Sequence, residues 1–192
     1  MKKVKILLTF ILIIVLSLTI VFAFTSTYKQ NHSGGYSSIC TLTEEDKIFI
    51  IDNFSQYNSV EELIVGVNKY ICENFTYTSK IYIQHFDFAE TIQSKKGLCF
   101  DLASLQKCIF TIISEHKGWD DVKVYVADVR ISMFSYHSYN FITVGDKKYF
   151  SDPTTNLDRY KKGKKVICYE DIGDLSFEQY SNMYNEKILN YH

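Results

Sequence analysis

The sequence has very little proline and glycine. One proline and eight glycines occur in 192 residues, which excludes a collagen-like or proline-rich fibrous protein. The formal net charge is only −1 at pH 7, so the chain lacks the basic character of a typical nucleic-acid-binding protein. Hydrophobic residues make up 46% of the chain and aromatic residues 16%. This composition excludes an intrinsically disordered chain, and the length predicts one folded domain of ordinary size.

The first 24 residues differ from the rest of the chain. Three lysines are followed by a run from Ile6 to Phe24 that contains no charged residue. A helix needs about 20 mainly apolar residues to cross a bilayer, so this run is long enough. The positive flank predicts that the start stays in the cytoplasm and that the rest of the chain lies outside. We expect residues 1–24 to be a signal anchor, a single-pass helix in the cell membrane; the alternative is a cleaved signal peptide, which would make the protein secreted.

A polar stretch follows the apolar run. Residues 25–42 have Gly34-Gly35 at their centre and few apolar side chains, which is typical of a flexible linker. We therefore expect one folded domain over 43–192, facing the extracytoplasmic side.

Signals for helix formation dominate the first half of this domain. At two places a serine or threonine is followed three positions later by an acid, the spacing typical of a helix start. Apolar residues then recur at the helical period, and a glycine stop signal follows the third helix. The stretch before that third helix is polar and aromatic, so we expect it to be irregular or partly extended. The predicted helices begin at Thr43 and span 59–74 and 98–115, and the irregular stretch spans 75–93.

In the second half of the domain the apolar period changes to two, which is typical of strands. Gly145-Asp146 separates two such runs and is a favoured two-residue hairpin loop. A chain with helices first and strands later is typical of an α+β fold with an antiparallel sheet. The predicted strands span 122–131, 136–144, 147–151 and 166–169, and a last helix begins at Ser176.

Cys99 lies at the predicted start of the third helix. The positive end of the helix dipole and the unpaired N–H groups of a first turn favour a thiolate over a thiol. Gly97, two residues earlier, is expected to let a substrate backbone approach closely. The alternative is that Cys99 is a small buried core residue, as many cysteines are.

His137 and Asp152 lie on the two strands of the predicted hairpin. If residues 145–146 form the loop, the register makes His137 and Asp152 diagonal neighbours on one face of the sheet, within reach of a hydrogen bond. Pro153 is expected to keep Asp152 extended and to end the ladder. Together with Cys99 they supply a nucleophile, a proton-exchanging imidazole and an orienting acid, which are the parts of acyl-transfer catalysis.

The residues around this triad resemble the transglutaminase-like superfamily. The segment 97–105 (GLCFDLASL) is similar to the family's nucleophile segment, and 137–154 is similar to its histidine strand, hairpin and Asp-Pro-Thr ending. The helix at 59–74 with the following Phe75-Thr76-Tyr77 resembles the segment found upstream. The resemblance implies a papain-like core, in which the nucleophile helix packs on an antiparallel sheet. It also implies that Cys99 is the nucleophile, His137 the general base and acid, and Asp152 the orienting partner.

The sequence departs from the family pattern beside the histidine. Tyr139 stands where the motif often has tryptophan, and Phe141 stands where an acidic residue is common. The family also uses a side chain upstream of the cysteine as one oxyanion donor, besides the backbone N–H of Cys99. The candidates for that side chain are Gln84, Tyr82 and Gln93.

The remaining motifs do not indicate further chemistry. No histidine has ligand spacing with a cysteine or an acid, and no phosphate-binding loop or dinucleotide fingerprint occurs, so we expect neither a metal nor a cofactor. The basic run at 161–165 is interpreted as a solvated loop, or alternatively as a contact with an anionic envelope polymer or lipid. Outside the cell, disulfides can form among four cysteines, and their pairing stays open. These four are Cys40, Cys72, Cys108 and Cys168.

The sequence thus predicts an extracytoplasmic cysteine acyl-transfer enzyme. It would act on glutamine side chains or peptide bonds through a thioester at Cys99, ending in cross-linking, deamidation or hydrolysis. We expect protein or peptide substrates, such as cell-envelope proteins or peptidoglycan peptides, a membrane contact through the N-terminal helix, and no nucleic acid. The alternatives are a non-catalytic envelope-binding module with the same fold and a cysteine peptidase of the wall-hydrolase type.

Overall fold

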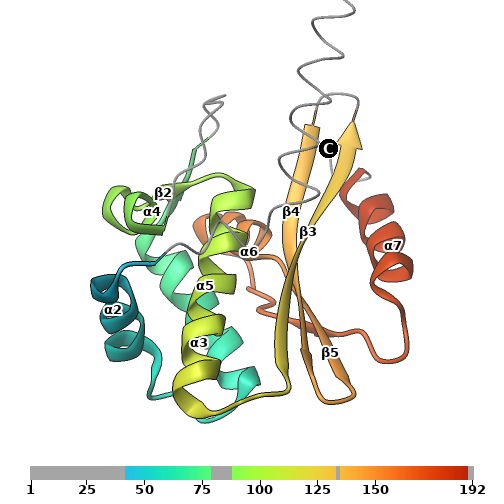
Figure 1. Cartoon of the computed structure of the whole chain (residues 1–192). Coiled ribbons are helices and arrows are strands. Elements are labelled where there is room, and N and C mark those ends of the chain that lie inside the picture. Colours follow the sequence, from blue (N-terminus) through green and yellow to red (C-terminus); the bar gives the residue numbers. More distant parts are fainter. Residues whose placement is uncertain (1–41, 79–87, 133–134, 190–192) are drawn as a thin grey trace, which may run out of the picture. The chain divides into compact units, whose positions relative to one another are not determined.

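The computed structural model describes residues 42–78, 88–132 and 135–189 (Figure 1). All of them belong to one compact unit, Ile39–His192. The predicted membrane helix at 1–24 and nearly all of the predicted linker lie outside the described residues. Among the helices that are described, none is both long and apolar enough to span a bilayer.

The predicted helix starts are confirmed. Thr43 caps the first helix through a capping box with Asp46, and the Ser59 hydroxyl accepts a hydrogen bond from the Glu62 N–H at the start of the second. Gly118 ends the central helix in the left-handed conformation, with φ at 67°. These helices are α2 (Glu44–Phe54), α3 (Val60–Asn74) and α5 (Cys99–Lys117).

The sheet has four antiparallel strands in the order β3-β4-β5-β6. Val144 pairs with Lys147 around the predicted two-residue loop, and the ladder continues to the pair Asn140 and Ser151. The predicted hairpin register is therefore confirmed, as is the α+β class with an antiparallel sheet. The strands are β3 (Val122–Ser132), β4 (Ser135–Val144), β5 (Lys147–Ser151) and β6 (Glu170–Asp171).

Three segments differ from the sequence predictions. The stretch 75–93, predicted as irregular or partly extended, contains a short strand, β1, but it also contains most of a short helix, α4, which was not predicted; β1 pairs in parallel with β2, which follows that stretch. A helix that was not predicted, α6, begins directly after Asp152. The strand predicted at 166–169 is wrong, because the Cys168 carbonyl accepts hydrogen bonds from the Ser151 and Asn68 side chains, and the edge strand forms further on. The bounds are β1 (Thr76–Tyr77), α4 (Phe88–Ser94), β2 (Lys96–Gly97) and α6 (Pro153–Lys161).

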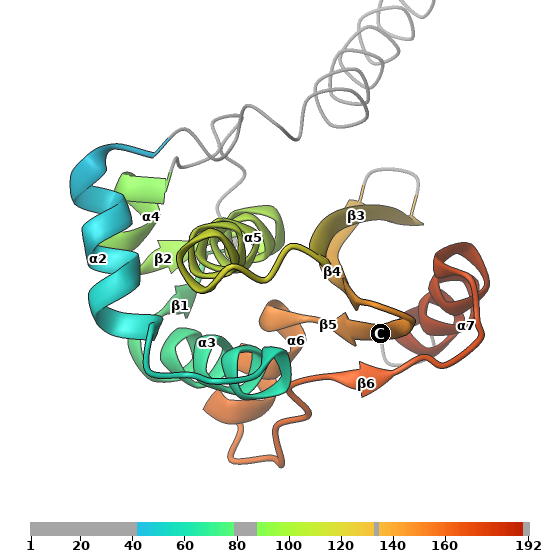
Figure 2. The same cartoon turned by 60° about the horizontal axis from the view of Figure 1, so that its bottom comes forward.

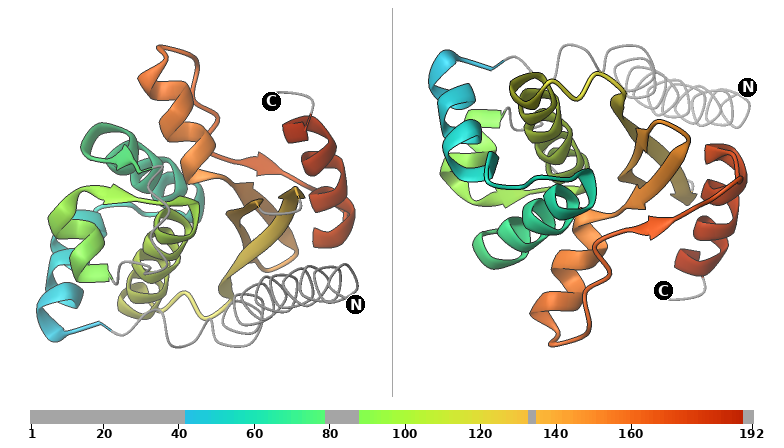
Figure 3. Two further views of the ribbon diagram at one scale, coloured as in Figure 1. Left: turned by 90° about the horizontal axis from the view of Figure 1, so that it is seen from above. Right: turned by 90° about the horizontal axis from the view of Figure 1, so that it is seen from below.

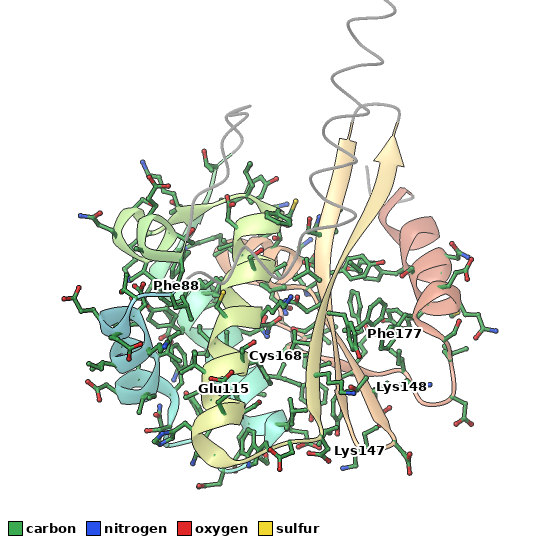
Figure 4. The ribbon with its side chains drawn as sticks, viewed as in Figure 1. Phe88, Glu115, Lys147, Lys148, Cys168 and Phe177 are labelled. Atoms are coloured by element: carbon green, nitrogen blue, oxygen red, sulfur yellow. The ribbon has the colours of Figure 1, made fainter. Side chains whose placement is uncertain are left out.

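Helices cover both faces of the sheet. The central helix α5 packs against β3 and β4 on one face, and α7 (Phe177–Leu189) packs on the other (Figures 2 and 3). The predicted helix start at Ser176 is confirmed, because Ser176 and Gln179 exchange two hydrogen bonds. Mostly aliphatic side chains, with a few phenylalanines, form the core between α2, α3, α5 and the first face. Aromatic side chains form the core on the second face, where Phe177 stacks on Phe141 with ring centroids 4.3 Å apart (Figure 4).

Candidate active site

Cys99 is the first residue of α5. Leu98 precedes the helix in an extended conformation, and its N–H donates to Asp101 Oδ2 at 2.8 Å, which fixes the first turn. The Cys99 side chain is partly exposed, and its sulfur is not part of a disulfide. The sulfur therefore lies at the positive end of a long helix, as the sequence predicted.

Gly97 has a packing role. A Cβ atom at this position would lie 3.1 Å from Leu102 Cδ2 and 3.2 Å from Asp101 Cβ, both on the first two turns of α5. These contacts are tighter than ordinary van der Waals separations. The backbone at Gly97 thus lies so close to the side chains of α5 that glycine fits best there. The sequence analysis had instead attributed this glycine to an approaching substrate.

His137 and Asp152 are in direct contact. His137 Nε2 lies 2.6 Å from Asp152 Oδ2, and the two side chains are only 13% and 4% exposed. The hairpin register brings them together, as predicted, but β5 ends at Ser151 and Asp152 has left the strand. Asp152 instead caps α6, accepting a hydrogen bond from the Thr155 N–H at 2.9 Å.

The protonation of this pair follows from its burial and its charges. Burial alone would lower the pKa of His137, but the charge and hydrogen bond of Asp152, and then a hydrogen bond with the Cys99 side chain, raise it to about 10. Burial alone would raise the pKa of Asp152, but the charge of His137 and hydrogen bonds hold it below its ordinary value. At neutral pH the pair is therefore an imidazolium and a carboxylate, with the Cys99 side chain against the imidazolium.

A buried polar network holds the elements of the site together. Asn140 Nδ2 donates to the Ala103 carbonyl at 3.0 Å and to Gln106 Oε1 at 2.6 Å, and Gln106 Nε2 donates to Ser151 Oγ at 3.2 Å. The network joins α5 to β4 and β5, the elements that carry Cys99 and His137 and that lead into Asp152. Breaking such a buried bond costs about 1–3 kcal/mol, because a polar group stays unsatisfied. The sequence held a signal for it: Gln106 is a polar residue on the apolar face of α5.

Two hydroxyl groups that the sequence analysis missed also reach the acid. Thr155 Oγ1 donates to Asp152 Oδ2 at 2.8 Å, and the Tyr184 hydroxyl from α7 donates to the same oxygen at 2.7 Å. Thr155 follows Asp152 at the spacing of a helix cap, which is a usable signal. Tyr184 is separated from Asp152 by 32 positions and has no such signal.

The structure describes only one of the three candidates for the second oxyanion donor. Gln84 and Tyr82 lie outside the described residues, and Gln93 is exposed on α4. Tyr77, which the sequence analysis did not consider as an oxyanion donor, lies beside the site, because β1 pairs it with Gly97. Tyr77 is 49% exposed, but the loss of water around its hydroxyl, followed by the charges of Cys99, Asp101 and Asp152, raises its pKa to about 12.

A groove lies at the other end of α5. Its volume is about 540 Å³, and its lining includes Trp119, Asp121, Glu61 and Lys147. Lys147 marks this end of the molecule in Figure 4. The lining contains no member of the triad, so the groove is not part of the candidate active site. Within the described residues, no cluster of three or more histidine, cysteine or acidic side chains is arranged to hold a metal ion.

We expect iodoacetamide to alkylate Cys99 at least about tenfold faster than Cys72 or Cys168 at pH 7. Burial, and then the neighbouring Cys168, raises the pKa of Cys72 to about 11, and burial also raises the pKa of Cys168. Cys99, by contrast, is partly exposed, begins α5 and is in contact with His137, which is the setting of a reactive cysteine. Peptide mapping after timed alkylation of the full chain in detergent measures the three rates. Equal rates would contradict an activated Cys99.

Solved structures are similar to part of this chain. No protein-family model matches the sequence, and no curated protein matches it. A protein from Cytophaga hutchinsonii, described as a candidate cysteine protease, is 16% identical over 74% of this chain and 53% of its own, with a TM-score of 0.48. A TGase is 15% identical over 69% of this chain and 37% of its own, with a TM-score of 0.40. The chain thus spans about half the length of the first structure and less of the second.

Proposed function

We propose that this chain is an extracytoplasmic cysteine acyl-transfer enzyme of the transglutaminase-like type, acting on amide bonds through a thioester at Cys99. The observation that carries the proposal is the position of the His137 ring, which is in contact with both Asp152 and the Cys99 side chain. The three groups come from α5, β4 and the start of α6. A buried imidazole between a carboxylate and a thiol at a helix start is the arrangement that nucleophilic cysteine catalysis needs.

The first step forms the thioester. The Cys99 thiolate attacks the carbonyl carbon of an amide, and the backbone N–H of Cys99, at the positive end of α5, is placed to stabilise the resulting oxyanion. Because Asp152 holds Nε2 of His137, the other ring nitrogen, Nδ1, is available to transfer a proton. The C–N bond breaks, the imidazolium proton passes to the departing nitrogen, and ammonia or an amine leaves.

The second step releases the acyl group. Neutral His137 takes a proton from water or from a primary amine, and the oxygen or nitrogen bonds to the acyl carbon as the Cys99 thiolate departs. Water gives deamidation or hydrolysis, and an amine gives a cross-link. The imidazolium and the thiolate are then restored. Which of these products dominates depends on the nucleophile that reaches the thioester.

The proposed location outside the cytoplasm rests on two features. One is the positive start and long apolar run of residues 1–24. The other is Cys108, which is disulfide-bonded, because disulfides persist in oxidising compartments. Cell-envelope proteins and peptidoglycan peptides are the substrates that a membrane-tethered enzyme on this side would meet.

An assay with a glutamine dipeptide and a fluorescent primary amine tests the proposed function. We expect the full chain in detergent to release ammonia from the dipeptide, because attack on the side-chain amide expels it. Incorporation of the amine would indicate cross-linking activity, and ammonia release alone would indicate a deamidase. Cleavage of the dipeptide would indicate a peptidase.

A matched reaction with Cys168→Ala is the control. This variant removes another thiol and should release ammonia at the rate of the unmodified chain. If none of the three products forms, and an activated ester such as p-nitrophenyl acetate also leaves Cys99 without an acyl group, the enzymatic proposal is wrong. The non-catalytic binding module would then be the better interpretation.

A further inference from the structure

The carboxylate of Asp152 is held by a residue from the far end of the chain. The Tyr184 hydroxyl lies 2.7 Å from Asp152 Oδ2 and 3.3 Å from Thr155 Oγ1. A phenol has one proton to donate, and the charged oxygen is the stronger acceptor. The tyrosine therefore donates to the same oxygen that faces His137.

The hydroxyl of Tyr184 is fixed in place by the packing of its ring. The ring centroid lies 4.4 Å from that of Phe150 on β5 and 5.5 Å from that of Tyr139 on β4. These strands lead into Asp152 and carry His137, respectively. Figure 3 shows α7 lying along the sheet on the face opposite α5. Aromatic packing between α7 and the sheet thus sets the distance from the tyrosine to the acid.

We propose, on the basis of the proposed function, that Tyr184 is a positioning residue for catalysis, which keeps Asp152 ionised and aimed at His137. The C-terminal helix is then a working part of the active site. Asp152 is almost fully buried, so its charge is stable only where donors and an opposite charge replace water. Oδ2 receives three such groups, from His137, Thr155 and Tyr184.

The groups around Asp152 influence the pH at which its carboxylate takes up a proton. Burial and then the charge of Asp152 raise the pKa of Tyr184 above its ordinary value, so this hydroxyl keeps its proton and remains a donor. Burial of Asp152 favours its neutral form, and the hydrogen bond from Tyr184 is one of the interactions that oppose this. The titratable groups around the carboxylate are His137 from β4, Tyr180 and Tyr184 from α7, and Tyr77 from β1, with Cys99 from α5 against His137.

The test is the pH dependence of Cys99 alkylation in Tyr184→Phe, measured on the full chain in detergent. Removal of one charge-assisted hydrogen bond should raise the pH at which Asp152 takes up a proton. A neutral Asp152 no longer keeps the buried His137 ring protonated beside Cys99. We therefore expect the acidic limb of the alkylation rate, the pH range in which the rate falls on acidification, to move upward by about one pH unit. Iodoacetamide labelling between about pH 3.5 and 8, resolved by peptide mapping, gives the profile; the phenylalanine ring preserves the aromatic packing.

Tyr180→Phe is the matched control. Tyr180 lies one turn earlier on the same helix, and its hydroxyl donates to Glu170 at 2.8 Å. This variant also loses one hydroxyl and one hydrogen bond to an acid, but not to Asp152. Its acidic limb should coincide with that of the unmodified chain. An unchanged limb in Tyr184→Phe, or an equal shift in both variants, would overturn the positioning role.

A second replacement covers the case in which Tyr184→Phe does not fold. With 3-fluorotyrosine at position 184 the hydroxyl is retained and becomes a stronger donor, so the acidic limb should move downward; a limb that stays in place would overturn the proposal. The two proposals fail in different ways. If the unmodified chain shows no selective labelling of Cys99, the proposed function fails. If labelling is selective but insensitive to position 184, the role of Tyr184 alone is wrong.

Discussion

Cys99→Ala should fold like the unmodified chain and lose all acyl-transfer activity. The substitution removes the sulfur that forms the thioester, and we expect a rate loss of at least about 10⁴-fold. Cys99 is partly exposed at the first position of α5, so alanine should change the free energy of unfolding by no more than about 0.5 kcal/mol. Intact mass after reaction with p-nitrophenyl acetate shows whether an acetyl group stays on the protein.

Cys168→Ala provides the comparison for this result. Cys168 is also partly buried and not part of a disulfide, but its thiol takes no part in the proposed mechanism. The acetyl adduct should form in this variant and be absent from Cys99→Ala. An adduct of equal yield in both variants would place the nucleophile elsewhere.

Asp152→Asn should lower kcat by about 10³- to 10⁴-fold while the fold is kept. The asparagine oxygen can still cap α6 by accepting from the Thr155 N–H, since asparagine is as good a cap as aspartate. Because the variant lacks the negative charge of Asp152, which raises the pKa of His137, the burial of the ring lowers that pKa without opposition. The imidazole becomes neutral at neutral pH and lacks the proton that, in the proposed mechanism, passes to the departing nitrogen. Steady-state rates from pH 5 to 10 measure the effect.

Stability gives an independent measure of the same pair. The pKa of His137 is raised from its ordinary value of 6.5 to about 10 in the folded protein. The protonated imidazole therefore stabilises the fold below pH 6.5, and this stabilisation is lost as the pH rises towards 10. Urea unfolding should show that decline in the unmodified chain and much less of it in Asp152→Asn.

Asp158→Asn is the control for Asp152→Asn. Asp158 lies on the same helix, is largely exposed and pairs with Lys162 at 2.9 Å. Exposed pairs of this kind contribute about 0–1 kcal/mol, so rate and stability should stay close to those of the unmodified chain. Near-normal turnover of Asp152→Asn would remove the acid from the mechanism.

Several predictions from sequence succeeded because their signals are local. Thr43 and Ser59 begin helices because a side-chain oxygen can satisfy an N–H group only three residues away. The loop at 145–146 sets the hairpin register because a two-residue turn leaves one pairing of the strands. In each case the interacting groups lie within a few residues of each other.

The missed helix α6 shows how one local signal can be interpreted in two ways. Asp152 and Pro153 were expected to end a strand, but an aspartate before a proline is also a good helix start, because proline fits the first helical position. The prediction at 166–169 failed for a different reason. Its apolar residues look like a strand, whereas the Cys168 carbonyl bonds to the Ser151 side chain, which comes from a segment 17 positions earlier.

By itself, the sequence determined the identity and spacing of a cysteine, a histidine and an acid, the helix that begins at the cysteine, and the hairpin whose register brings the histidine and the acid together. Only the tertiary structure decided how the acid is held: Tyr184 from the last helix and the buried network around Asn140 come from segments far apart in the chain. The physical reason is range. Caps and turns are set by backbone geometry over a few residues, whereas the ionisation of Asp152 depends on donors that only the packing of α7 and α5 against one sheet brings within reach.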